Sequence, residues 1–176
     1  MKKRVAVLAV NPVNGSGLFQ YLEVFYENGI SYKVYAVSPT KDIRTNSGIA
    51  LQADDVIANL KGHEDEYDAL VFACGDAIPV FAQHADEPHN IMLMEVLKTF
   101  GEKGKIMIGH CAAALMFEKA GITKGRKLAV HPLAKPAIVN GTATDNATET
   151  DGNFYTAQNE NKIAALLPSV LTALKG

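Results

Sequence analysis

The sequence of 176 residues contains no tryptophan, only two cysteines and no apolar run of about 20 residues. Without such a run we expect no membrane-spanning helix, and two cysteines are too few for a disulfide-stabilised secreted scaffold, so reduced thiols are expected. The formal net charge of -2 at pH 7 lacks the basic excess that binding several phosphates needs. We therefore expect a cytoplasmic protein that binds neither membranes nor nucleic acid.

The amino-terminal stretch MKKRVAVLAV begins like a secretory signal. Its apolar run is short, and it breaks at Asn11-Pro12 without a small-residue cleavage pattern, so we interpret it as the start of the fold. Hydrophobic residues make up 48% of the chain and charged residues 20%, which is ordinary for globular proteins. No repeat, low-complexity tract or linker is apparent. The length then fits one domain over residues 1–176.

Short β-branched runs alternate with amphipathic segments of helix length, which is typical of βαβ units around a mostly parallel sheet. Uniformly apolar runs indicate strands that are covered on both faces. The spacing of apolar residues and the glycines that follow predict the helices. The expected strands are 4–10, 32–37, 67–74, 105–109 and 127–130, and the expected helices are 18–29, 90–104 and 112–121.

Four further features refine this pattern. We expect Asp54 to start a helix after a short strand, and Pro132 to start a short helix. Asp151-Gly152 predicts a hairpin turn, and Pro168 should kink or split the helix predicted over residues 161–175. Together the elements predict an α/β fold, a flavodoxin-like three-layer α/β/α sandwich with a mostly parallel central sheet.

The segment GHCAAALMFEKAGI, residues 109–122, places Cys111 where a predicted strand passes directly into a helix. Ligands collect at the carboxyl ends of parallel strands, and such a sharp turn, called a nucleophile elbow, lifts one side chain above the sheet edge. The helix N-terminus favours a thiolate there. The alternative is a buried cysteine that serves only as a small apolar side chain. Position alone leaves both interpretations open.

Several blocks in the same order resemble the ThiJ/PfpI superfamily, which includes intracellular proteases, glyoxalases, chaperones and a parkinsonism-associated deglycase. YDALVFACGD is similar to the family strand that ends in paired glycines, and IMIGHCAAALMFEKAGI is similar to its nucleophile elbow. VHPLAK resembles a segment that follows the elbow helix, and ETDGNFYTA resembles a late hairpin. The resemblance runs nearly end to end, and it implies the class I glutamine amidotransferase-like fold.

The resemblance implies roles for particular residues. Cys111 would be the nucleophile, and the backbone N–H groups of Gly75 and Ala112 would form an oxyanion hole, which acts by pointing in advance at charge that develops in the transition state. His131 would be the base that approaches the cysteine from another loop. Cys74 stands where the family has the first of its two glycines.

Two further positions depart from the family pattern. Gly17 occupies the place of a family glutamate that contacts the cysteine, and Ala112 occupies the place of a histidine found in many protease-like members. Asp76 is the nearest acid that could substitute for the glutamate, although a loop aspartate is more often a cap or turn residue. His110 precedes the cysteine, and neighbouring side chains at a strand end point to opposite faces, so we expect it not to reach the sulfur.

Other motifs are weak. NPVNGSG, residues 11–17, lacks a complete GxGxxG and a Walker lysine, although a helix N-terminus attracts anions. His63, His84 and His89 lack the spacing of a zinc site and are interpreted as surface residues. Cys74 and Cys111 should end neighbouring strands, so a reversible disulfide is conceivable, with independent thiols as the favoured alternative.

Three hypotheses for function follow. The first is a cysteine-dependent hydrolase, protease- or amidase-like, that acts on a peptide or small-molecule substrate without cofactor or metal. The second is a redox-sensing or stress-response chaperone protein without catalysis. The third is a small-ligand or flavin-binding flavodoxin-like module. The resemblance also implies a homo-oligomer, a dimer or larger.

Overall fold

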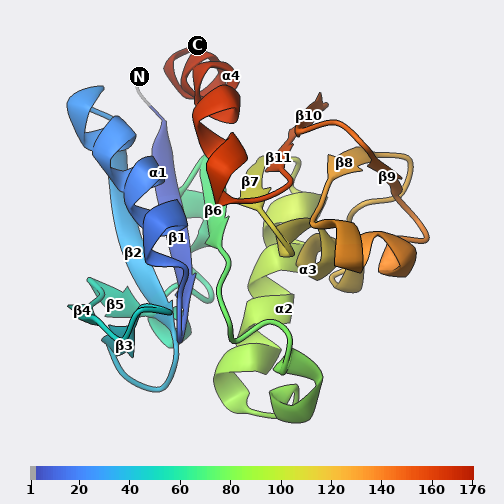
Figure 1. Ribbon diagram of the computed structural model, residues 1–176. Helices are drawn as coiled ribbons and strands as arrows, with labels where there is room; N and C mark the ends of the chain where they lie inside the picture. Colours follow the sequence, from blue (N-terminus) through green and yellow to red (C-terminus); the bar gives the residue numbers. More distant parts are fainter. Residues whose placement is uncertain (1–2) are drawn as a thin grey trace.

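A computed structural model describes residues 3–176 and shows a seven-stranded sheet with helices on both faces (Figure 1). The strand order is β10-β11-β7-β6-β1-β2-β5, and every pairing is parallel except that between β10 and β11. The strands of this sheet are β1 Arg4–Val10, β2 Ser31–Val37, β5 Asp55–Val56, β6 Ala69–Ala73, β7 Ile106–His110, β10 Thr148–Asp151 and β11 Phe154–Ala157.

Four α-helices form the outer layers, with α1 packed beside α4 and α2 beside α3 (Figure 1). The helices are α1 Gly15–Glu27, α2 Pro88–Glu102, α3 Ala113–Lys119 and α4 Ile163–Lys175. Two small sheets join β3 Asp42–Arg44 to β4 Ala50–Gln52 and β8 Lys127–Ala129 to β9 Thr142–Thr144. Short 3₁₀ turns are η1 Ile57–Asn59, η2 Glu64–Glu66, η3 Phe81–His84, η4 Pro132–Ala137 and η5 Glu160–Lys162.

The centre of the sheet is the core of the molecule. All of β6 is buried, and β1 is buried from Val5 to Val10, as expected for parallel strands covered by helices on both faces. This arrangement confirms the predicted α/β class, the flavodoxin-like layering and the mostly parallel sheet. Since β1 lies between β2 and β6, strand order reverses at β1, and the carboxyl ends of these strands flank the position where such folds bind ligands.

The predicted helix after Asp54 is wrong. Residues 55–56 instead form the edge strand β5, which pairs with β2, and only the short turn η1 follows. The Asp54 carboxylate accepts the backbone N–H of Val34 at 2.8 Å, and the Asp54 N–H donates to the Val34 carbonyl at 3.0 Å. These two hydrogen bonds hold the segment against β2. Asp54 therefore anchors the start of the edge strand β5 and does not begin a helix.

Three other local predictions had different outcomes. The short helix expected from Pro132 is the 3₁₀ turn η4. The expectation that Pro168 splits the last helix is wrong, because α4 continues through it. The hairpin was predicted correctly, because β10 and β11 pair across Asp151-Gly152, where Gly152 has a φ of 59°. This positive φ is readily adopted by glycine and explains the residue type at that turn.

Candidate active site

Cys111 links β7 to α3 with a backbone φ of 58°, and among residues 3–176 it is the one non-glycine residue in the left-handed region. Such a conformation costs of order 1–3 kcal/mol for a non-glycine residue and persists only where its surroundings fix it. Its N–H donates to the Ala157 carbonyl at 3.0 Å, and its carbonyl accepts the His131 N–H at 3.0 Å. The predicted elbow is therefore present, held by hydrogen bonds on both sides.

Gly109 explains how the chain can turn so sharply at this point. A Cβ at residue 109 would lie 2.3 Å from the Ala113 Cβ, so only glycine lets the first turn of α3 fold back against β7. Gly75 has a similar role on the neighbouring strand, since its Cβ would lie 2.2 Å from the Pro12 carbonyl oxygen. Both glycines are required by close approach of backbone at the carboxyl edge of the sheet.

The Cys111 side chain is half-buried and lines a cavity of about 800 Å³ at this edge. The cavity brings together every side chain or backbone group that the sequence analysis assigned to the site. Its lining includes Asn14, Cys74, Gly75, Asp76, His110, Cys111, Ala112, Lys119, His131 and Glu160.

The thiol of Cys74 lies against Cys111. A hydrogen bond from Cys74 is the main cause that lowers the pKa of the Cys111 thiol, and the backbone N–H of Ala112 lowers it further. Burial opposes this shift, as do the carboxylates of Glu160 and Asp76. The pKa of Cys74 shifts in the opposite direction. It is raised well above the ordinary value because Cys74 donates the hydrogen bond to Cys111 and because its thiol is buried. The pair therefore favours a Cys111 thiolate beside a protonated Cys74.

The two predicted oxyanion-hole donors lie beside these sulfurs. The backbone N–H of Ala112 lowers the pKa of both Cys111 and Cys74, and the backbone N–H of Gly75 lowers that of Cys74. A sulfur and an oxyanion are both electron-rich acceptors, so amides that point at the thiols are suited to bind negative charge there. Cys74 is the largest of the groups that lower the pKa of the Cys111 thiol, and the N–H of Ala112, the N-cap of α3, adds to it.

His131 reaches the cavity from the loop between β8 and η4. Its Nδ1 accepts the N–H of Leu133 at 3.2 Å, which caps the turn η4. A neutral ring with Nδ1 as acceptor carries its proton on Nε2. Within residues 3–176 no hydrogen bond joins this ring to the Cys111 sulfur, and the role of His131 as the base stays a prediction.

His110, which also lines the cavity, is packed against α1. Its side chain is 1% exposed, and its Nδ1 lies 3.3 Å from the hydroxyl of Tyr21 on α1. Burial lowers the pKa of His110 to about 4, so the ring is neutral near pH 7. Burial also raises the pKa of Tyr21, which keeps its hydroxyl protonated beside the neutral ring.

Asp76 is an exposed loop residue at the cavity edge. Its backbone N–H donates to the Asn46 side chain at 3.3 Å, and its carboxylate acts against the Cys111 thiolate. Whether Asp76 substitutes for the family glutamate stays a prediction. The largest cause that lowers the Cys111 pKa is Cys74, to which sequence reasoning assigned no such effect.

Glu118 on α3 is a second residue that sequence reasoning missed. Its carboxylate accepts the backbone N–H groups of Val139, Asn140 and Gly141 at 3.1, 2.7 and 3.1 Å, and also the Thr123 hydroxyl. Burial opposes ionisation, but these hydrogen bonds outweigh it and lower the pKa of Glu118 to about 2. The carboxylate thus ties the chain that follows η4 to the elbow helix.

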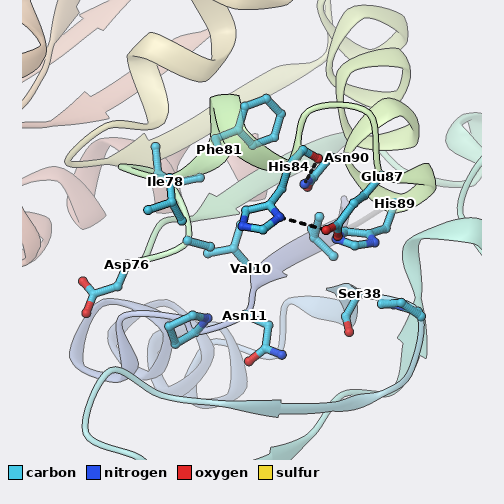
Figure 2. Close-up of a pocket in the computed structure, with 15 residues that line it drawn as sticks. Val10, Asn11, Ser38, Asp76, Ile78, Phe81, His84, Glu87, His89 and Asn90 are labelled. Carbon is cyan, nitrogen blue, oxygen red and sulfur yellow. Dashed lines mark hydrogen bonds and ion pairs between the residues drawn. The ribbon is translucent and has the colours of Figure 1, made fainter.

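A second cavity, of about 430 Å³, lies at the carboxyl ends of β1 and β2 and shares Asp76 with the first (Figure 2). Glu87 accepts from His84 at 2.9 Å and lies 3.2 Å from the Nε2 of His89.

Within residues 3–176 no group of three His, Cys, Asp or Glu side chains is placed to hold a metal ion. No helix in this range is long and apolar enough to cross a membrane.

A sequence model described as the DJ-1/PfpI family matches residues 3–173. The chain belongs to the DJ-1/PfpI family. Protein ppBat of Bacteroides thetaiotaomicron is 73% identical over 175 residues, which cover 99% of this chain and all of that protein.

Solved structures agree with this membership. A crystal structure from Bacteroides thetaiotaomicron, described as "putative protease I", is 73% identical, covers 98% of this chain and 99% of its own, and superposes with a TM-score of 0.98. Drosophila melanogaster DJ-1beta is 19% identical, with coverage of 100% of this chain and 92% of its own and a TM-score of 0.85, so it supports the DJ-1/PfpI fold alone.

Proposed function

We propose that this DJ-1/PfpI protein is a cysteine-dependent hydrolase, protease- or amidase-like, with Cys111 as nucleophile. The observation that carries the proposal is the Cys111 thiol itself, which sits on a strained elbow in a cavity of about 800 Å³ with its pKa lowered by Cys74. A thiolate is the nucleophilic form of cysteine, so a depressed pKa raises the reactive fraction near neutral pH.

The chemistry follows from the groups around the sulfur. The Cys111 thiolate attacks the carbonyl carbon, and the electron pair of the C=O bond moves to oxygen, where the N–H groups of Gly75 and Ala112 bind the developing oxyanion. When the oxyanion collapses, the bond to the leaving group breaks, and His131 relays to this group a proton that the ring takes up from a water molecule. The hydroxide formed from that water hydrolyses the acyl-enzyme and returns the Cys111 thiolate.

The size and the polar lining of the cavity favour polar substrates that are either small molecules or extended peptides. Its volume of about 800 Å³ lies within the range typical of small-molecule sites. Asp76 and Glu160 place two carboxylates near the reactive sulfur, and Lys119 is the single lysine in the lining. We infer that the site favours neutral or cationic acyl compounds, such as peptide amides, over anionic ones.

Turnover of an acyl substrate tests the proposal. Purified protein should hydrolyse members of a panel of activated esters and fluorogenic peptide amides, and Cys111→Ala should abolish this hydrolysis. Mass spectrometry of Cys111→Ala and of the wild type should show an acyl adduct only in the latter. Hydrolysis that survives the substitution would overturn the assignment of the nucleophile.

Oligomeric state stays a prediction. The family resemblance implies a dimer or larger assembly, and sedimentation of the purified chain measures it directly.

A further inference from the structure

Cys74 lies directly after the central strand β6 and is 2% exposed. The resemblance to the family places a glycine at this position, so the thiol is a feature of this chain that the proposed hydrolysis does not require as a reacting group. The structure shows what surrounds it: the N–H groups of Gly75 and Ala112 and the sulfur of Cys111.

Strand register places the two cysteines side by side. The parallel pairing of β6 with β7 joins Leu70 to Met107 and Phe72 to Gly109, and two further residues along each strand are Cys74 and Cys111. Neighbouring strands are about 4.8 Å apart, and the Cα atoms of disulfide-bonded cysteines are usually about 4.4–6.8 Å apart. Both residues lie just past the ends of β6 and β7 at the same edge of the sheet, and their side chains interact directly.

The two thiols differ in access. Cys111 is half-buried and faces the cavity, whereas Cys74 lies beneath it and is almost completely covered. A small reagent that enters the cavity therefore meets Cys111 first. Any oxidised form of Cys111 then has a protonated thiol as its immediate neighbour.

We propose that Cys74 and Cys111 form a two-thiol redox site, in which peroxide oxidises Cys111 and Cys74 resolves the product as an intramolecular disulfide. The inference rests on the proposed function, because both need a reactive Cys111 thiolate. It assigns a new role to Cys74 and predicts that oxidation ends at a reversible state.

The steps balance with hydrogen peroxide as the oxidant. The Cys111 thiolate attacks one peroxide oxygen, the O–O bond breaks, and the departing hydroxide takes a proton to leave as water, which gives the sulfenic acid. Cys74 loses its proton and attacks the Cys111 sulfur, the S–O bond breaks, and the hydroxide released combines with that proton as a second water. Two thiols are oxidised to one disulfide and one peroxide is reduced to two waters.

This pairing has a consequence for hydrolysis. A disulfide consumes the nucleophile, so the oxidised protein should be inactive, and a dithiol reductant should restore it. Resolution by Cys74 also competes with a second oxidation of the sulfenic acid to sulfinic acid, which most cells do not reverse. Cys74 would therefore protect the site from irreversible loss.

Peptide mass spectrometry of the wild-type protein tests the inference. Fully reduced protein is treated with one equivalent of hydrogen peroxide, remaining thiols are blocked with iodoacetamide, and the sample is digested without reductant. We expect a peptide pair that contains Cys74 and Cys111 and has lost two hydrogens, and its disappearance after dithiothreitol. Cys111 as sulfinic acid with a free Cys74, or disulfides between molecules, would overturn the inference.

The variant Cys74→Ser provides the matched comparison, and Cys74→Ala serves if serine disturbs the buried position. Either should lose the linked peptide and, with two or more equivalents of peroxide, accumulate Cys111 sulfinic acid where the wild type forms the disulfide. Equal resistance to sulfinic acid in variant and wild type would contradict the resolving role. The wild-type result stands whether or not a variant folds.

Labelling with iodoacetamide before peroxide separates this inference from the proposed function. A Cys111 that is alkylated by iodoacetamide but forms no disulfide overturns the two-thiol site alone. A Cys111 that reacts with neither reagent in the folded protein overturns both.

Discussion

The imidazole of His110 occupies the space that a side chain at residue 17 would need. A Cβ on Gly17 would lie 2.4 Å from the His110 Nε2 and 2.6 Å from the Asn14 Oδ1. The family glutamate expected at this position is therefore excluded by the packing of this chain. The histidine that precedes the cysteine and the glycine in the first turn of α1 form one complementary pair.

The first prediction concerns this pair. Gly17→Ala should destabilise the protein by about 1–3 kcal/mol, because overpacking a filled site outweighs the better helix propensity of alanine. In a His110→Ala background the same substitution should cost less, since the ring is gone and only Asn14 remains close. Urea unfolding of the four proteins measures the coupling free energy, and a cost that is the same in both backgrounds would refute the pairing.

The second prediction concerns Glu118. Its pKa of about 2 lies below the ordinary value of 4.5, so the carboxylate contributes stability above about pH 4.5 that is lost as the pH falls towards 2. Glu118→Gln should cost about 2 kcal/mol at pH 7, since it leaves buried donors without a charged acceptor. Unfolding free energies from pH 7 to pH 2 check both statements.

Glu102→Gln is the control for Glu118. Glu102 is an exposed residue at the end of α2, and its ion pair with Lys98 is 3.8 Å long, so its loss should change stability little. If Glu118→Gln cost no more than this control, the carboxylate would not be the tie between the elbow helix and the chain after η4.

The third prediction is a pair of opposite shifts in the pKa of Cys111. Cys74→Ala removes the hydrogen bond that lowers this pKa and should raise it, while Asp76→Asn removes a repelling carboxylate and should lower it. The pH dependence of iodoacetamide alkylation at Cys111 reports both values. Shifts of the same sign in the two variants would contradict the electrostatic account of the site.

The fourth prediction separates the two functions of His131. Asparagine can still cap η4 with its side-chain oxygen but cannot supply a proton, so His131→Asn should preserve stability and reduce hydrolysis about 10²-fold or more. His63→Asn, at an exposed residue paired with Glu66, is the control and should leave hydrolysis unchanged. A parallel loss of stability and activity in His131→Asn would indicate a structural role instead.

Much of the fold could be predicted because its signals are local. Uniformly apolar runs marked β1, β6 and β7, and the direct passage from strand to helix marked the elbow at Cys111. The prediction of a helix after Asp54 was wrong because the sequence does not show which N–H the carboxylate will accept. Its partner is the Val34 N–H of another strand and not an N–H of a helix.

The electrostatics of the site depend on contacts between distant segments, which no local pattern encodes. Cys74 and Cys111 were expected on neighbouring strands, but which of them would donate to the other follows from the depth of each side chain in the folded chain. The backbone partners of Glu118 lie more than 20 residues away along the chain, on a loop whose path is fixed only by packing.

Alkylation of native wild-type protein tests the central claim most directly. Iodoacetamide should modify Cys111 before Cys74 in the folded protein, with a pH midpoint below that of an ordinary thiol, about 8.5. A Cys111 that is modified only after unfolding, or whose midpoint lies at or above the ordinary value, would contradict the account of an activated thiol at the elbow.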